Sequence, residues 1–181
     1  MSSSLSAWPR DVALDFLSGG GELGALMRAK DWSATPFGLP ETWSRNVKAA
    51  VSICLNSRFP LLLWIGPELR IVYNDAYIPF LGAAKHPAML GEPGRTAWSE
   101  IWPAIGPMHD AVRAGRATWV EHYQMFFARR VRHEEVYVTF GYSPILDEGG
   151  RTIEGIFCAC YETTAEVIRE RRLSTLRHLG A

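Results

Sequence analysis

The sequence has no run of about 18 apolar residues, the length that a helix needs to cross a bilayer. Cysteine is scarce, with three residues in 181, and an odd number argues against a disulfide scaffold. The first residues lack the basic start and the apolar stretch of a secretory signal. We therefore expect a cytoplasmic protein with no membrane span.

An excess of charge is also missing, because 19 basic residues balance 19 acidic ones. Nucleic-acid affinity depends largely on a positive field at the phosphates, so no nucleic-acid partner is predicted. One local basic cluster, Arg129, Arg130, Arg132 and His133, is interpreted as a solvated turn between two strands. A composition of 48% hydrophobic and 21% charged residues is typical of one globular domain with an extension.

Catalytic and metal-binding patterns are absent as well. Residues 19–24 match the glycine pattern of a dinucleotide fingerprint, but no βαβ unit surrounds them, so we interpret them as a flexible break between two helices. Cys158 and Cys160 share one face of a predicted strand, yet no second Cys/His pair completes a zinc site. The residues around His178 do not match a kinase phosphoacceptor box. We expect no catalytic activity in this chain.

The first half of the chain predicts short helices and one hairpin. Residues 1–56 are expected to form a helical extension that ends in a helix over residues 41–56. Two apolar runs, 60–65 and 69–73, flank Gly66-Pro67 and predict an antiparallel hairpin. A helical turn over residues 76–81 follows. The helix predicted over residues 97–114 contains Pro103 and Pro107, which indicates a bend or two short pieces.

The last third of the chain predicts three strands, over residues 119–127, 135–142 and 153–161. In the first, Trp119, Tyr123, Met125 and Phe127 are expected to share one face. Neither face of these strands is fully polar, so we expect the sheet to be covered on both sides. The helix over residues 41–56, the C-terminal helix or a second copy of the chain would supply the outer cover.

Several local motifs resemble PAS domains. The segment 71–82 resembles the PAS strand that ends at Asn before an aromatic helix, and 91–94 with 98–102 is similar to the PAS loop and connecting helix. Residues 142–145 and the following acidic-glycine turn resemble the last PAS hairpin. Upstream, residues 31–38 and 56–60 resemble the segment that precedes PAS domains in certain bacterial sensor histidine kinases.

This resemblance implies an α+β PAS fold: a five-stranded antiparallel sheet with short helices on one face, an N-terminal helical extension and a C-terminal signalling helix. The expected boundaries are 1–56, 57–164 and 165–181. The implied function is a sensory and dimerisation module, with a downstream histidine kinase or other output domain as its partner. A homodimer through the N-terminal helix, the outer sheet face and the exit helix is expected. The alternative is a structural dimerisation domain with a filled core and no ligand.

The resemblance also implies site residues. The candidate pocket between helices and sheet consists of Trp98, Trp102, Tyr123, Phe140 and Phe157, although these side chains also suit a filled core. PAS exits usually end in Asp-x-Thr, and here Glu162 and Thr164 hold those places as the expected signal relay. Residues 94–98 lack the cysteine of flavin-binding light sensors, so covalent flavin photochemistry is not expected. Haem binding through His109 is disfavoured, because His109 is expected to lie partly exposed beside the apolar stripe of its helix.

Overall fold

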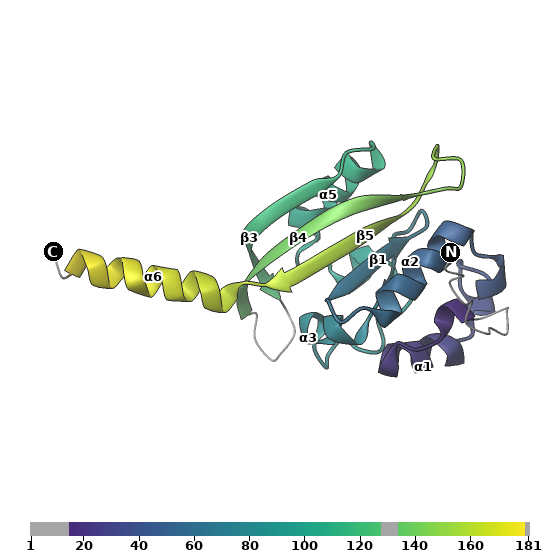
Figure 1. Ribbon diagram of the computed structural model, residues 1–181, viewed down its shortest axis with the longest axis horizontal. Coiled ribbons are helices and arrows are strands. Elements are labelled where there is room, and N and C mark those ends of the chain that lie inside the picture. Colours follow the sequence, from purple (N-terminus) through teal and green to yellow (C-terminus); the bar gives the residue numbers. More distant parts are fainter. Residues whose placement is uncertain (1–14, 128–133, 180–181) are drawn as a thin grey trace, which may run out of the picture.

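An antiparallel sheet of five strands organises the molecule (Figure 1). The computed structural model describes residues 15–127 and 134–179, so the basic cluster at 129–133 lies outside the described residues. The order of strands across the sheet is β2-β1-β5-β4-β3, and every neighbouring pair is antiparallel. The predicted sheet is confirmed, with the bounds Leu61–Ile65 (β1), Arg70–Tyr73 (β2), Thr118–Phe127 (β3), Glu134–Leu146 (β4) and Ile153–Glu162 (β5).

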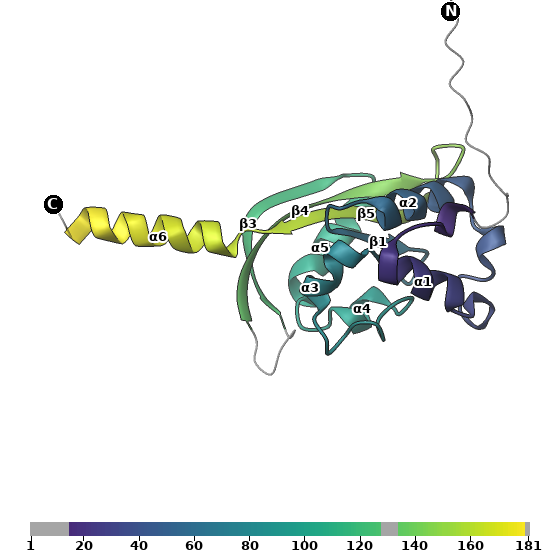
Figure 2. The same ribbon diagram turned by 60° about the horizontal axis from the view of Figure 1, so that its bottom comes forward.

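Short helices cover one side of the sheet, which we call the inner face (Figure 2). They are α3 (Ile78–Leu81), α4 (Gly94–Ala97) and α5 (Trp102–Arg113). The helix predicted over residues 97–114 starts too early, since α5 begins only at Trp102, residues 98–101 form a turn, and Ala97 is the last residue of α4. Pro103 lies in the first turn of α5, where a missing N–H costs nothing, whereas Pro107 lies inside the helix.

The opposite, outer face is partly covered by α2 (Arg45–Asn56), and α1 (Gly21–Ala29) lies beside α2. The predicted start of α2 at residue 41 is wrong. Residues 40–42 form a separate 3-10 turn, and the Ser44 hydroxyl caps the helix by accepting a hydrogen bond from the Val47 N–H at 3.2 Å. Buried side chains of α1 and α2 join the same core as those of the strands.

The extension is tied to the segment that follows β2 through Asp75. The Asp75 carboxylate accepts hydrogen bonds from the N–H groups of Glu22 and Leu23, at 3.0 and 2.8 Å. This carboxylate therefore occupies the positive N-terminal end of α1, where the phosphate of a dinucleotide would have to bind. At Gly21, with φ of 54°, a Cβ atom would lie only 1.9 Å from the Asp75 carboxylate. The glycine run thus separates two helical segments. Because Gly21 has no side chain, the Asp75 carboxylate can approach the N-terminus of α1.

A break in the β3–β4 register moves one predicted face. Val120 pairs with Phe140 and Tyr123 with Val138, so the pairing slips between them, and His122 takes a positive φ of 48°. Trp119 consequently packs over Gly141 on the outer face and is 60% exposed, while Met125 and Phe127 are buried. The expectation that Trp119 shares their face is wrong, because a bulge interrupts the strict alternation of side chains between the two faces of the strand.

The C-terminal helix α6 (Thr164–Leu179) projects away from the body, and none of its residues is buried (Figures 1 and 2). The expected exit helix is therefore present, and it does not fold back on its own domain. Within the described ranges, every helix is too short or too polar to pass through a membrane.

Candidate functional site

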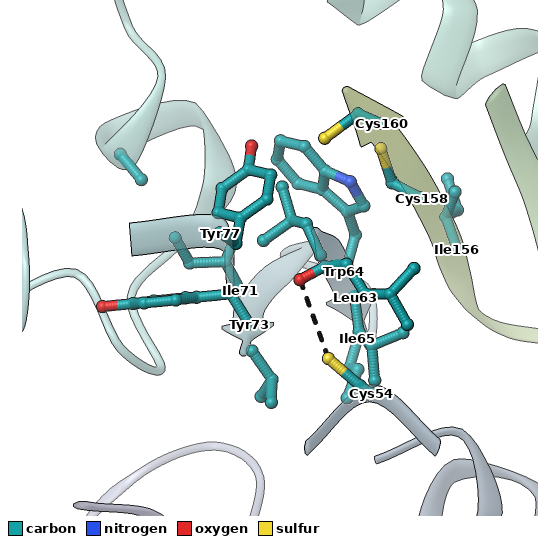
Figure 3. Close-up of a cluster of buried hydrophobic side chains, with 14 of the residues drawn as sticks. Cys54, Leu63, Trp64, Ile65, Ile71, Tyr73, Tyr77, Ile156, Cys158 and Cys160 are labelled. Atoms are coloured by element: carbon teal, nitrogen blue, oxygen red, sulfur yellow. Dashed lines mark hydrogen bonds between the residues drawn. The ribbon is translucent and has the colours of Figure 1, made fainter. Parts of the chain in front are cut away.

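The space between the inner helices and the sheet is almost filled. A cavity of only about 20 Å³ remains there, enough for about one water molecule. Aromatic rings form most of its wall, including Trp64 from β1, Trp98 from the segment after α4 and Phe127 from β3. Trp98 and Phe127 lie 5.2 Å apart between ring centroids. Figure 3 shows Trp64 on the same side of the sheet as Tyr77, Cys158 and Cys160.

The five aromatic residues of the expected pocket do not come together. Trp98 and Phe140 line the interior cavity. Tyr123 lies at its margin, 6.2 Å from Phe140 between ring centroids. Phe157 pairs with Leu63 and belongs to the outer face, since Cys158 and Cys160 alternate with it on the inner face. Trp102 lies outside the cavity and stacks on His109 at 5.2 Å.

His109 is buried, with 1% of its surface exposed, so the expectation of a partly exposed histidine is wrong. Its ring packs between Trp64 at 4.3 Å, Tyr142 at 4.5 Å and Trp102. Nδ1 lies 2.9 Å from the Ile105 carbonyl and donates to it, whereas the buried Nε2 has no hydrogen-bond partner within residues 15–127 and 134–179. Burial lowers the pKa of His109 to about 4, so the ring is neutral at pH 7.

The interior does not fit a flavin or a haem in this conformation. Small-molecule sites usually measure about 300–1,000 Å³, far above the 20 Å³ found here. The His109 Nε2 atom faces neighbouring rings rather than an open cavity large enough for a porphyrin. Cys158 and Cys160 do line the cavity, and burial raises the pKa of Cys158 well above its usual value, which keeps it a thiol. Among the described residues, no group of three His, Cys, Asp or Glu side chains is placed to hold a metal ion.

The second candidate site is the junction between β5 and α6. Its central atom is the Thr164 hydroxyl oxygen, which accepts the Tyr137 N–H at 3.0 Å and donates to the Glu162 carboxylate at 2.8 Å. The Thr163 N–H donates in turn to the Tyr137 carbonyl at 2.7 Å. Glu162 and Thr164, the two residues expected from the Asp-x-Thr comparison, thus form a clamp. The clamp fixes the first turn of α6 to β4.

A second set of contacts, which we call the latch, was not expected from the sequence. It joins Arg171 in α6 with Tyr137 and Glu135 in β4. The Arg171 guanidinium lies 4.9 Å from the centre of the Tyr137 ring, donates to the Tyr137 hydroxyl and lies 3.7 Å from the Glu135 carboxylate.

Hydrogen bonds keep the Glu135 carboxylate of the latch ionised. The Tyr137 hydroxyl donates to Glu135 at 2.7 Å, and this hydrogen bond holds the pKa of Glu135 below its usual value. Gln124 of β3 donates to the same Glu135 oxygen at 2.7 Å. Glu135 is therefore ionised at neutral pH and attracts Arg171. Thr164 and Arg171 lie seven residues apart, or about two turns, so both lie on one side of α6.

Comparison with known proteins finds similar folds among solved structures. No family model matches this sequence, and no curated protein matches it. Among solved structures, an RNA-binding light-oxygen-voltage receptor is 20% identical with a TM-score of 0.50, and the match covers 69% of this chain. The chain matches only 34% of that receptor's length.

Two further solved structures are similar over much of the chain. The PAS domain of Bordetella pertussis BvgS is 18% identical with a TM-score of 0.39, over 67% of this chain and 89% of that one. A sensory box sensor histidine kinase from Vibrio cholerae is 17% identical with a TM-score of 0.43, over 57% of this chain and 81% of that one. Of these three structures, the light-oxygen-voltage receptor has a TM-score of 0.50, and at 20% identity its likeness to this chain concerns the fold.

Proposed function

The chain is a PAS-type domain by its fold, and we propose that it is a sensory and dimerisation module that passes its conformational state through α6 to an output domain. The observation that carries this proposal is the junction. The clamp at Thr164 and the latch at Arg171 both end on Tyr137, so a shift of β4 is transmitted directly to the first two turns of α6.

Dimerisation through α6 is part of the proposal. The helix has 16 residues, none of them buried, and its clamp and latch contacts with the body lie in its first half. An isolated helix of this length is marginal in water. Ile168, Leu176 and Leu179 are 39%, 65% and 80% exposed on one stripe of it. Pairing with a second α6 would cover this stripe and extend a coiled coil towards an output domain such as a histidine kinase. We place the module in the cytoplasm, acting without catalysis of its own, with its cysteines as free thiols.

A scaffold that dimerises without sensing is the second candidate, and the filled interior favours it. Two outcomes separate the candidates. A sensor has two states of the β4–α6 junction, and a change of state alters output. A scaffold has one state, and loosening the junction changes only stability.

The relay is tested by replacing Thr164 with Val in a chimera whose α6 continues in register into a dimeric histidine kinase. The substitution removes the hydroxyl that binds Tyr137 and Glu162, and we expect altered autophosphorylation with the domain still folded. Thr42→Val is the matched control, because the exposed Thr42 lies outside α6 and the junction and its hydroxyl donates to the nearby Leu39 carbonyl. Equal activities of Thr164→Val and Thr42→Val would contradict a relay through this junction.

Dimerisation is tested by sedimentation of the chain over a range of concentrations. Leu176→Glu places a charge on the apolar stripe and is expected to shift the chain to monomer. Ser174→Glu adds the same charge on the opposite side of the helix and should leave the dimer intact. A chain that sediments as a monomer at all concentrations would exclude the paired helices.

A further inference from the structure

A large recess formed by the described residues lies outside the sheet interior. It measures about 750 Å³, within the range of small-molecule sites. Its walls come from the loop before α2, the turn between β1 and β2, and the start of β5. The interior cavity offers only 20 Å³. A ligand that enters without rearranging the core therefore finds room here, between the extension and the sheet.

One wall of the recess is built in advance from aromatic rings. Phe37 and Trp43 line it, and their ring centroids lie 5.5 Å apart. Trp32 supports both from behind, at 5.2 Å from each. The Trp43 indole N–H donates to the Phe37 carbonyl at 3.1 Å, which holds the loop closed. Residues 31–38, which resemble the segment that precedes PAS domains in certain sensor histidine kinases, thus contribute Trp32 and Phe37 to this wall.

The opposite wall belongs to the sheet and is linked to the first. Ile65 of β1 and residues 152–156 at the start of β5 line it. The Ser44 hydroxyl donates to the Glu154 carboxylate at 2.5 Å across the recess, and Asn46 donates to the Leu146 carbonyl at 2.8 Å. The recess therefore keeps its shape through contacts between the extension and the last hairpin.

The charges at the recess select the class of ligand. Arg113 and Arg151 line it together with one carboxylate, Glu154, so its formal charge is +1. Arg113 donates to the Pro67 carbonyl at 2.7 Å. The backbone N–H of Arg151 donates to the Asp147 carboxylate at 2.7 Å, and no ion pair or hydrogen bond of the Arg151 guanidinium is found among the described residues. A guanidinium binds a carboxylate with two parallel hydrogen bonds. A single excess positive charge suits a monoanion better than a phosphate dianion.

We propose that this recess binds an amphipathic monocarboxylate, with an aromatic or branched apolar body against Phe37 and Trp43 and its carboxylate at Arg151. The site lies at the start of β5, and β5 ends at the Glu162 clamp. Binding at the recess does not depend on the proposed relay, because no residue of the junction lines it.

The test uses naphthalene-1-acetate and its uncharged amide, titrated into the full chain by calorimetry. We expect saturable binding of the acid and at least about tenfold weaker binding of the amide, because only the acid pairs with a guanidinium. Arg151→Gln should weaken the binding of the acid by about the same factor. The matched control is Arg169→Gln, an exposed arginine of α6, which should leave the affinity unchanged.

Location is tested on the same samples by amide and indole N–H chemical shifts. We expect shifts at the Trp43 indole and at Gly66 and Gly155, with the buried Trp64 and Trp98 indoles unchanged. Equal affinities of acid and amide would overturn the proposal. So would shifts at Trp64 and Trp98 instead of Trp43, or no saturable binding at about 1 mM of the acid. A failed relay in the Thr164→Val chimera would leave these readouts untouched.

Discussion

The inner and outer faces of the sheet carry different kinds of residue and do different work. On the inner face, large buried rings leave about 20 Å³, and the indole nitrogens of Trp64 and Trp98 and the Nε2 atom of His109 find no hydrogen-bond partner among the described residues. On the outer face, one end holds a recess of about 750 Å³ and the other end holds the latch on Tyr137. The inner face thus serves stability. Space for a ligand, and charged groups that can change partners, lie on the outer face.

The comparison is tested most strongly by truncating one tryptophan on each face. Trp64→Ala removes a ring that is 1% exposed, and we expect a loss of about 3–5 kcal/mol in the free energy of unfolding. Trp119→Ala removes a ring that is 60% exposed, and the expected loss is about 0.5 kcal/mol or less. Urea denaturation measures both. Similar losses would show that the faces do not differ in this way.

The next effect concerns pH and the buried histidine. The His109 pKa is about 4 when folded against 6.5 when exposed, so the unfolded chain binds the extra proton between these values. Stability from this group is complete above pH 6.5 and falls as the pH drops towards 4, by about 3 kcal/mol in all.

Neighbouring charges modify this titration in opposite directions, since Arg113 lowers the pKa of His109 and Asp110 raises it. Unfolding measured from pH 7 to pH 4 should show a smaller loss in His109→Leu than in the natural chain. An identical pH profile for both would mean that His109 is solvated.

A smaller effect is expected where the extension joins the sheet. Asp75→Ala removes the carboxylate that caps α1 and should cost about 1 kcal/mol, since the Glu22 and Leu23 N–H groups lose their acceptor. Hydrogen exchange of these two amides should accelerate. Asp110→Ala, on the exposed side of α5, is the control. Unchanged protection of residues 22 and 23 would contradict the capping role.

The smallest change in global stability is expected at the latch. Arg171→Ala removes an exposed guanidinium, so the free energy of unfolding should hardly change. Amides in the first two turns of α6 should nevertheless exchange about tenfold faster, because local opening of α6 loses its anchor on Tyr137. Arg172→Ala is the control from the next position. Equal exchange in the two variants would show that the latch does not hold α6.

Local patterns predicted the elements of the fold well. Two apolar runs on either side of a Gly-Pro turn were sufficient for β1 and β2. Pro103 and Pro107 did not indicate where the helix over residues 97–114 is interrupted, since both lie within α5 and the interruption at residues 98–101 precedes them. The clamp at Glu162 and Thr164 followed from a short motif, because its atoms lie two residues apart. The latch was missed because Arg171 and Tyr137 are 34 residues apart, and no local period links a helix to a particular strand.

The sequence by itself determined the strands, the order of elements and the exit helix, since these depend on periodicity and turn chemistry among near neighbours. Only the tertiary structure decided which rings meet. The bulge in β3 turned Trp119 outwards, the register of β5 placed Phe157 on the outer face, and the packing of α5 buried His109. The recess and the latch also depend on contacts between distant segments. Such contacts follow from how helices and sheet pack together, which a one-residue shift in register changes completely.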